Sequence, residues 1–141
     1  MNILNFLDAN VWLALVWSRH IHSTRAREWF ERSSEEKFLF CRITQMTVLR
    51  LLTTAAVMGS DVKKMHQAWE LWDEVCADNR IESLPEPEAL EQEFLRLSAR
   101  QSPSPKVWVD AYLLAFASVA GLKLVTFDRG LRSRGPEVYV L

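Results

Sequence analysis

Three aspartates, Asp8, Asp110 and Asp128, each stand at the polar edge of an apolar run, although they are far apart along the chain. If β-strands end at Leu7 and Phe127, then Asp8 and Asp128 lie at the carboxyl-end rim of a sheet, where open α/β folds bind their ligands. Three carboxylates gathered at one rim would repel one another strongly unless a cation lay among them. The pattern therefore predicts a divalent-metal site.

Each aspartate also has a purely structural explanation. Asp8 can cap a helix that begins near Val11, and Asp110 can cap the apolar helix that follows it. Asp128, in the run Asp-Arg-Gly, can be a turn residue. Taken one at a time these explanations are sufficient, but together they do not explain why each apolar run ends in Asp. Both interpretations stay open on the residues alone.

The donor types favour a hard cation. Mg²⁺ and Mn²⁺ prefer carboxylate oxygens and water, and the chain offers those rather than Cys/His clusters. Cys41 and Cys76 have no CxxC spacing and are expected to be free thiols, although one disulfide is possible. His20 and His22 are two residues apart, which does not place them on one helical face. Since there is no Gly-rich phosphate loop either, metal-assisted hydrolysis of a phosphodiester is the chemistry that remains.

Apolar runs alternate between strand-like and helix-like stretches, which predicts an α/β three-layer domain with a largely parallel central sheet. We expect strands at 3–7, 38–41, 123–127 and 137–141, helices at 11–17, 22–30, 44–58, 62–76, 88–100 and 109–120, a short segment at 81–84 and a loop at 102–105. Gly59-Ser60-Asp61 is expected to stop one helix and cap the next. Residues 1–141 are expected to form one domain.

The net charge of −1 gives no global attraction to nucleic acid, so any such contact needs a local basic patch. Arg129, Arg132 and Arg134 directly follow Asp128 and are the best candidates for contacts to phosphate, although a solvated turn would explain them equally well. The N-terminus does not resemble a signal peptide and no apolar stretch is long enough to span a membrane. We therefore expect a soluble, cytoplasmic protein without a membrane partner.

Six tryptophans are many for a chain of this length. Most are expected in the core or at an interface rather than as groups that stack on bases. Trp12, Trp17 and Trp29 stand on the first two predicted helices. They could form an exposed apolar patch where a partner binds.

Four segments carry a family resemblance: Leu7–Val11, Thr44–Thr53, Val109–Ala117 and Leu124–Arg129. In this order, and over nearly the whole chain, they resemble the PIN-domain family and, more narrowly, its VapC-type toxins. The resemblance implies an α/β/α domain with a parallel sheet. It also implies acidic residues that bind Mg²⁺ or Mn²⁺ and activate water for attack on an RNA phosphodiester.

Carried over residue by residue, the resemblance assigns Asp8, Asp110 and Asp128 to three of the family's acidic positions, as metal ligands and catalytic groups. The family's usual fourth acid, a Glu at the start of the central helix, falls on Gln45. An amide carbonyl can still accept a hydrogen bond from metal-bound water, but it removes one negative charge and should weaken cation binding. Asn10 and Thr126 are expected beside the ligands, where Thr126 can reach a ligand or a phosphate.

The resemblance also implies partners: a cognate VapB-like antitoxin that inserts a basic side chain among the acids, an RNA substrate, and a second copy in a homodimer. The leading hypothesis is a metal-dependent endoribonuclease that acts as the toxin of a type II toxin-antitoxin pair. The alternative is a catalytically impaired PIN domain that binds RNA or antitoxin without efficient cleavage. A phosphohydrolase acting on small phosphates is a third hypothesis, which the absence of a Gly-rich loop disfavours.

Overall fold

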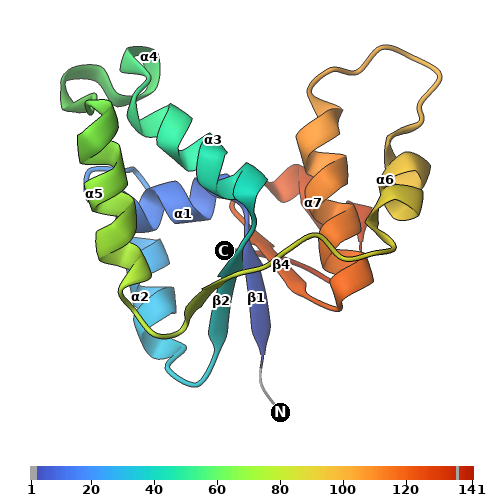
Figure 1. The fold of residues 1–141 in the computed structure, drawn as a ribbon, viewed down its shortest axis with the longest axis horizontal. Coiled ribbons are helices and arrows are strands. Elements are labelled where there is room, and N and C mark those ends of the chain that lie inside the picture. The colour runs from blue at the N-terminus through green and yellow to red at the C-terminus, as the bar shows by residue number, and fades with distance from the viewer. Residues whose placement is uncertain (1–2, 136) are drawn as a thin grey trace.

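Five short strands form one sheet in which all neighbouring strands are parallel, in the order β3-β2-β1-β4-β5 (Figure 1). The computed structural model describes residues 3–135 and 137–141. The strands are β1 (Leu4–Leu7), β2 (Lys37–Phe40), β3 (Ile81–Ser83), β4 (Lys123–Thr126) and β5 (Val138–Val140). The predicted parallel sheet is confirmed, and the segment at 81–84 proves to supply an edge strand.

Helices cover both faces of the sheet, which confirms the three-layer α/β/α architecture (Figure 1). They are α1 (Ala9–Val16), α2 (Ser23–Arg32), α3 (Arg42–Leu52), α4 (Ala55–Met58), α5 (Met65–Cys76), α6 (Leu90–Ser98) and α7 (Val107–Ala120), with 3₁₀ turns η1 (Gly59–Asp61) and η2 (Arg129–Arg134). The central strand β1 sends Leu7 into the core under α1 and Phe6 into the core under α7. The Phe6 ring stacks on Phe116 of α7 at a centroid distance of 4.6 Å. Burial on both faces explains why the strand reads as a nearly continuous apolar run.

The prediction of an exposed patch formed by Trp12, Trp17 and Trp29 is wrong. Trp12 is fully buried between Phe40 and Trp72, and the Trp29 side chain is also buried. The three rings at Trp12 lie at tilted or edge-on angles, which is the favoured geometry for buried aromatic clusters. The partly buried Trp17 donates its indole N–H to Asp61.

The helix predicted over 44–58 is interrupted at Thr53 and Thr54. The Thr53 hydroxyl donates to the carbonyl of Leu49 over 3.0 Å, and the Thr54 hydroxyl donates to the carbonyl of Arg50 over 2.6 Å. Such bonds from side chain to main chain compete with the helical ladder. The chain then forms the separate short helix α4.

Several helix starts differ from the predicted ones, and two of these differences concern a capping aspartate. Asp61 does not cap the following helix, because α5 begins only at Met65 and the Asp61 carboxylate accepts from Trp17 and Arg19 instead. In contrast, α7 begins at Val107, two residues earlier than predicted. Asp110 therefore lies inside the first turn of α7 and is not its N-cap.

Cys41 and Cys76 are both free thiols, as expected. Among the described residues, no helix is long and apolar enough to cross a bilayer.

Candidate active site

The pairing of β1 with β4 brings two of the three aspartates to the same rim. Leu7 pairs with Val125 in the parallel register, and the backbone N–H of Asp8 donates to the Val125 carbonyl over 2.8 Å. Asp8 is the first residue after β1, and Asp128 follows β4 by two residues. The sheet thus places both side chains at its carboxyl-end rim, as the sequence predicted.

Thr126 is the centre of a hydrogen-bond network at this rim. Its side chain is fully buried, and its hydroxyl donates to Asp8 Oδ2 over 2.8 Å. The same oxygen accepts from the backbone N–H of Asp128 over 3.0 Å and from Asn10 Nδ2 over 3.4 Å. Asn10 Oδ1 in turn accepts from the backbone N–H of Phe127 over 3.3 Å. Four predicted site residues, Asp8, Asn10, Thr126 and Asp128, therefore belong to one network.

The two rim carboxylates also have the structural roles that the sequence allowed. Asp8 Oδ1 accepts from the backbone N–H of Ala9 over 2.7 Å and caps α1. Asp128 Oδ1 accepts from the backbone N–H of Gly130 over 2.8 Å and opens η2. A Cβ at Gly130 would lie 3.1 Å from Asp128 Oδ1, so a glycine suits this close approach. Because a carboxylate has about four acceptor positions, these caps leave capacity for a further ligand.

Asp110 lies in the first turn of α7, and its charge acts on the rim carboxylates. Burial raises the pKa of Asp8, hydrogen bonds from Thr126 and Ala9 oppose that rise, and the charges of Asp110 and Asp128 add to it. Burial and the charge of Asp128 raise the pKa of Asp110, while Arg134 lowers it. The three carboxylates therefore repel one another across partly buried space. A cation placed among them would relieve that repulsion.

The oxygen donors at the rim suit a divalent ion that keeps several of its waters better than an ion fully coordinated by protein side chains. Within residues 3–135 and 137–141, no three His, Cys, Asp or Glu side chains are grouped so that they would enclose a metal ion as they stand. Mg²⁺ keeps several waters in enzymes and is commonly held by one or two carboxylates together with substrate phosphate. The carboxylate oxygens at the rim repel one another and are of the type that such an ion prefers.

Gln45 is buried in the first turn of α3, but none of its described hydrogen bonds joins it to the aspartates. Its Oε1 accepts from the guanidinium of Arg42, one turn earlier on the same helix. The sequence reasoning missed Arg42, although the i, i+3 spacing of the two residues was visible. Arg42 thus places a positive charge beside Gln45, the position to which the resemblance assigns the family's usual glutamate.

The three candidate arginines lie together on η2, directly after Asp128. Arg134 is near enough to lower the pKa of Asp110, and the side chains of Arg129 and Arg132 are exposed. His22 is a neighbour of the rim that the sequence reasoning missed. Its ring stacks on Phe127, the residue between Thr126 and Asp128, at a centroid distance of 4.5 Å.

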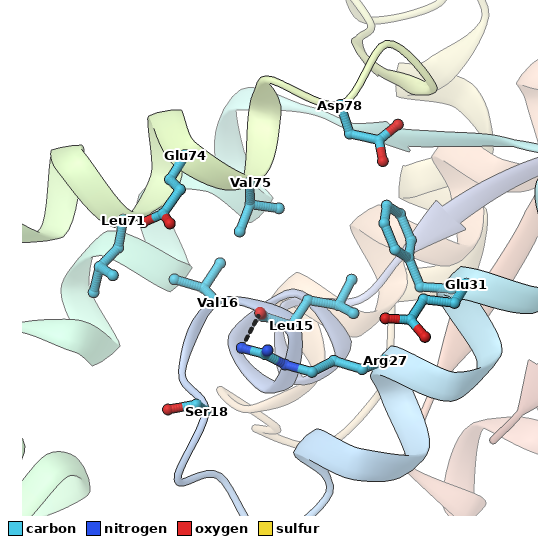
Figure 2. A pocket seen from close by; sticks show the side chains of 10 residues that line it. Leu15, Val16, Ser18, Arg27, Glu31, Leu71, Glu74, Val75 and Asp78 are labelled. Atoms are coloured by element: carbon cyan, nitrogen blue, oxygen red, sulfur yellow. Dashed lines mark hydrogen bonds between the residues drawn. The ribbon is translucent and has the colours of Figure 1, made fainter.

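A cavity of about 460 Å³ between α1, α2 and α5 is lined by none of the three aspartates (Figure 2). Apolar side chains, among them Leu15 and Val75, share its lining with the carboxylates of Glu31 and Glu74. Arg27 donates to the Leu15 carbonyl over 3.4 Å at its centre. The excess of negative charge does not suit a phosphate, so we do not place the catalytic site there.

A model of the PIN domain family matches residues 6–135 of the chain. The chain belongs to the PIN domain family. The ribonuclease VapC41 of Mycobacterium tuberculosis is 41% identical over 133 residues, which cover 91% of each protein. The family assignment made from the four sequence segments is thereby confirmed.

Solved structures agree on the fold. The crystal structure of VapBC2 from Rickettsia felis, bound to a DNA fragment from its promoter, contains a chain that superposes with a TM-score of 0.68 at 13% identity, covering 99% of this chain and 98% of that one. The crystal structure of Mycobacterium tuberculosis VapC20, a toxin that cleaves the sarcin-ricin loop, gives a TM-score of 0.65 at 13% identity over 91% of each chain. At this level of identity the likeness is one of PIN domain fold.

Proposed function

We propose that this PIN domain is a metal-dependent endoribonuclease and the toxin of a type II toxin-antitoxin pair. The observation that carries the proposal is the acidic rim, where Asp8 and Asp128 share Thr126 as a hydrogen-bond partner and Asp110 is electrostatically coupled to both. The relative at 41% identity is named a ribonuclease, which supports RNA as the substrate.

In this proposal Asp8, Asp110 and Asp128 hold Mg²⁺ or Mn²⁺. Such an ion, when bound, polarises the phosphodiester and lowers the pKa of a water that attacks it. The chain's own contribution is orientation. Thr126 and the backbone N–H of Ala9 fix the Asp8 carboxylate, and Asn10 braces the segment that carries Asp128. Arg129, Arg132 and Arg134 bind neighbouring phosphates of the RNA through charge-assisted hydrogen bonds.

The direct test is incubation of the purified protein with cellular RNA and Mn²⁺ or Mg²⁺. We expect discrete cleavage products that a chelator abolishes and that an Asp8→Asn variant does not form. Asn is also a good N-cap, so this variant keeps the cap of α1 and removes mainly the charge. Metal-independent cleavage, or equal cleavage by the variant, would contradict the proposal.

A catalytically impaired PIN domain is the second candidate, and the Gln45–Arg42 pair is the observation that favours it. A neutral amide held by a cation lowers the negative charge available to a metal. RNA binding by the wild-type protein without metal-dependent cleavage would establish this candidate.

Gln45→Glu tests whether position 45 belongs to the metal site. An added charge there should tighten Mn²⁺ binding by about tenfold, equivalent to ~1.4 kcal/mol, as measured by calorimetric titration. Since Arg42 would neutralise part of that charge, the gain should be larger in the Gln45→Glu/Arg42→Ala double variant. Gln92→Glu, on the exposed surface of α6, is the matched control. An unchanged titration in both Gln45 variants would remove residue 45 from the site.

The proposed partners follow from the same assignment. The superposed Rickettsia felis structure is that of VapBC2 bound to a DNA fragment from its promoter. We propose that a cognate VapB-like antitoxin inhibits this chain by placing a basic side chain among the three aspartates. We also propose that the protein forms a homodimer and is located in the cytoplasm. Size-exclusion chromatography with light scattering, with and without a co-expressed antitoxin, measures the mass of the homodimer and of its complex with the antitoxin.

A further inference from the structure

A second cavity, of about 590 Å³, lies between α2 and the edge strand β5. One wall is formed by polar and charged side chains of α2, including Arg25, Glu28 and Arg32, and the other by Tyr139, Val140 and Leu141. None of the catalytic candidates lines it, so it is a separate site on the same molecule.

The cavity adjoins the acidic rim. His22 lines it and also stacks on Phe127, at a centroid distance of 4.5 Å. Val140 pairs with Thr126 in the parallel register, and the backbone N–H of Leu141 donates to the Thr126 carbonyl over 2.9 Å. The cavity and the acidic rim are therefore neighbours, joined at Thr126 and Phe127.

The ionised side chains in the lining are mainly basic. Arg25 and Arg32 are exposed, and among the described residues neither forms a salt bridge. Glu28 is the only acidic side chain in the described lining. The cavity thus has two guanidinium groups available for an anion, in a protein whose net charge of −1 gives no global attraction to nucleic acid.

An exposed aromatic ring completes the cavity. Tyr139 is 42% exposed although it lies on a strand, and Lys123 Nζ lies 4.6 Å from its ring centroid. A solvent-accessible ring beside basic side chains is the combination by which proteins hold single-stranded nucleic acid, with bases stacked on rings and phosphates on cations. An isolated anion would use the arginines but leave the ring unexplained.

We propose that the cavity between α2 and β5 is a second RNA subsite, which binds a nucleotide of the substrate away from the scissile bond. Tyr139 stacks on its base, and Arg25 and Arg32 contact its phosphates. The inference rests on the proposed ribonuclease function and deepens it: the substrate is a single strand long enough to run from the acidic rim to β5.

The test compares RNA single strands of about 4 and about 16 nucleotides, the range of site sizes found in proteins that bind single strands. Binding is followed by fluorescence anisotropy in the Asp8→Asn background, which prevents cleavage. Tyr139→Leu should weaken binding of the long strand roughly 5- to 150-fold, the range measured for loss of one stacked base. Arg25→Ala/Arg32→Ala should lower the salt dependence of long-strand binding by up to about 1.4 in slope. Binding of the short strand should change little in either variant.

Two control variants distinguish loss of the subsite from loss of ring size or of positive charge elsewhere on the surface. Tyr139→Phe keeps the ring and should retain the affinity of the parent, and Arg100→Ala removes an exposed arginine outside the cavity. Thermal melting of each variant checks the fold. Long-strand binding unchanged in Tyr139→Leu and in the double arginine variant would overturn the subsite while leaving the ribonuclease proposal intact. A parent that binds neither strand would overturn both.

Discussion

Replacing Asp110 by Asn should abolish RNA cleavage and, at the same time, raise the melting temperature of the metal-free protein. The first effect follows from the proposed role of Asp110 as a metal ligand, because losing a ligand and its transition-state electrostatics costs roughly 10³-fold or more. The second follows because burial and the charge of Asp128 raise the pKa of Asp110, so its ionised form is disfavoured in the native state. Asp110 makes no side-chain hydrogen bond among those described, so Asn removes the repulsion at little structural cost.

The stabilisation should depend on pH in a defined direction. The pKa of Asp110 is raised above its ordinary value of 3.8, so the native state binds its proton more tightly than the unfolded state does. Wild-type stability therefore falls as the pH rises from 3.8 through the raised native pKa, and the penalty is complete only above that native pKa. The advantage of Asp110→Asn should be present at pH 7 and vanish below the ordinary pKa.

Calorimetric melting with and without Mn²⁺ measures both effects, since about 1 kcal/mol shifts the melting temperature of a domain of this size by roughly 4 °C. Mn²⁺ should stabilise the wild type by mass action and Asp110→Asn much less. Asp73→Asn, on the surface of α5, controls for loss of one charge. A destabilised, still active Asp110→Asn protein would contradict the assignment.

Thr126→Val should lower kcat/KM for RNA by about 10- to 100-fold, the cost typical of removing a group that orients metal ligands. Valine keeps the shape of threonine but removes the hydroxyl that donates to Asp8 and accepts from the backbone N–H of Asp128. Losing a partner for a buried polar group costs about 1–3 kcal/mol, so unfolding in denaturant should shift as well. The variant thus tests the Thr126 network in function and in stability.

Thr126→Ser is the matched control, because it keeps the hydroxyl and removes only a methyl group. It should retain most of the activity. If Thr126→Val and Thr126→Ser lost activity equally, packing rather than the hydroxyl would explain the effect. If neither lost activity, Asp8 would not need Thr126 for its orientation.

The acidic rim was predictable because it depends on where apolar strands end in the sequence. Buried parallel strands appear as apolar runs, and the residues after them must meet at one edge of the sheet, so strand logic placed Asp8 and Asp128 at the rim. The apolar-run pattern also singled out Asp110, but this residue belongs to a helix and could not be placed by strand logic. The family resemblance assigned Asp110 to the site and added Asn10 and Thr126. The helix-cap interpretation and the site interpretation of Asp8 do not exclude each other, because Asp8 both caps α1 and belongs to the Thr126 hydrogen-bond network.

Other features depended on short elements, local side-chain hydrogen bonds or tertiary contacts that the pattern of apolar residues does not show. The edge strand β3 has three residues, of which only Ile81 is buried, so it lacked a clear apolar run. The break after α3 arises from hydroxyl bonds of Thr53 and Thr54. Trp12 and Trp29 were candidates for an exposed apolar patch, but both side chains are buried, and α1 is enclosed by the sheet, α3 and α5. The stack of His22 on Phe127 joins residues that no local pattern connects.

The pairing of β1 with β4 has a consequence for synthesis of the protein on the ribosome. Asp8 is translated near the start of the chain, but its hydrogen-bond donor Thr126 follows 118 residues later. Contacts between such distant residues form only after the intervening chain has been made. A nascent chain that stops short of β4 therefore carries isolated acids and no assembled rim, so a nuclease of this design stays inactive next to the ribosomal RNA until translation of its domain is almost finished.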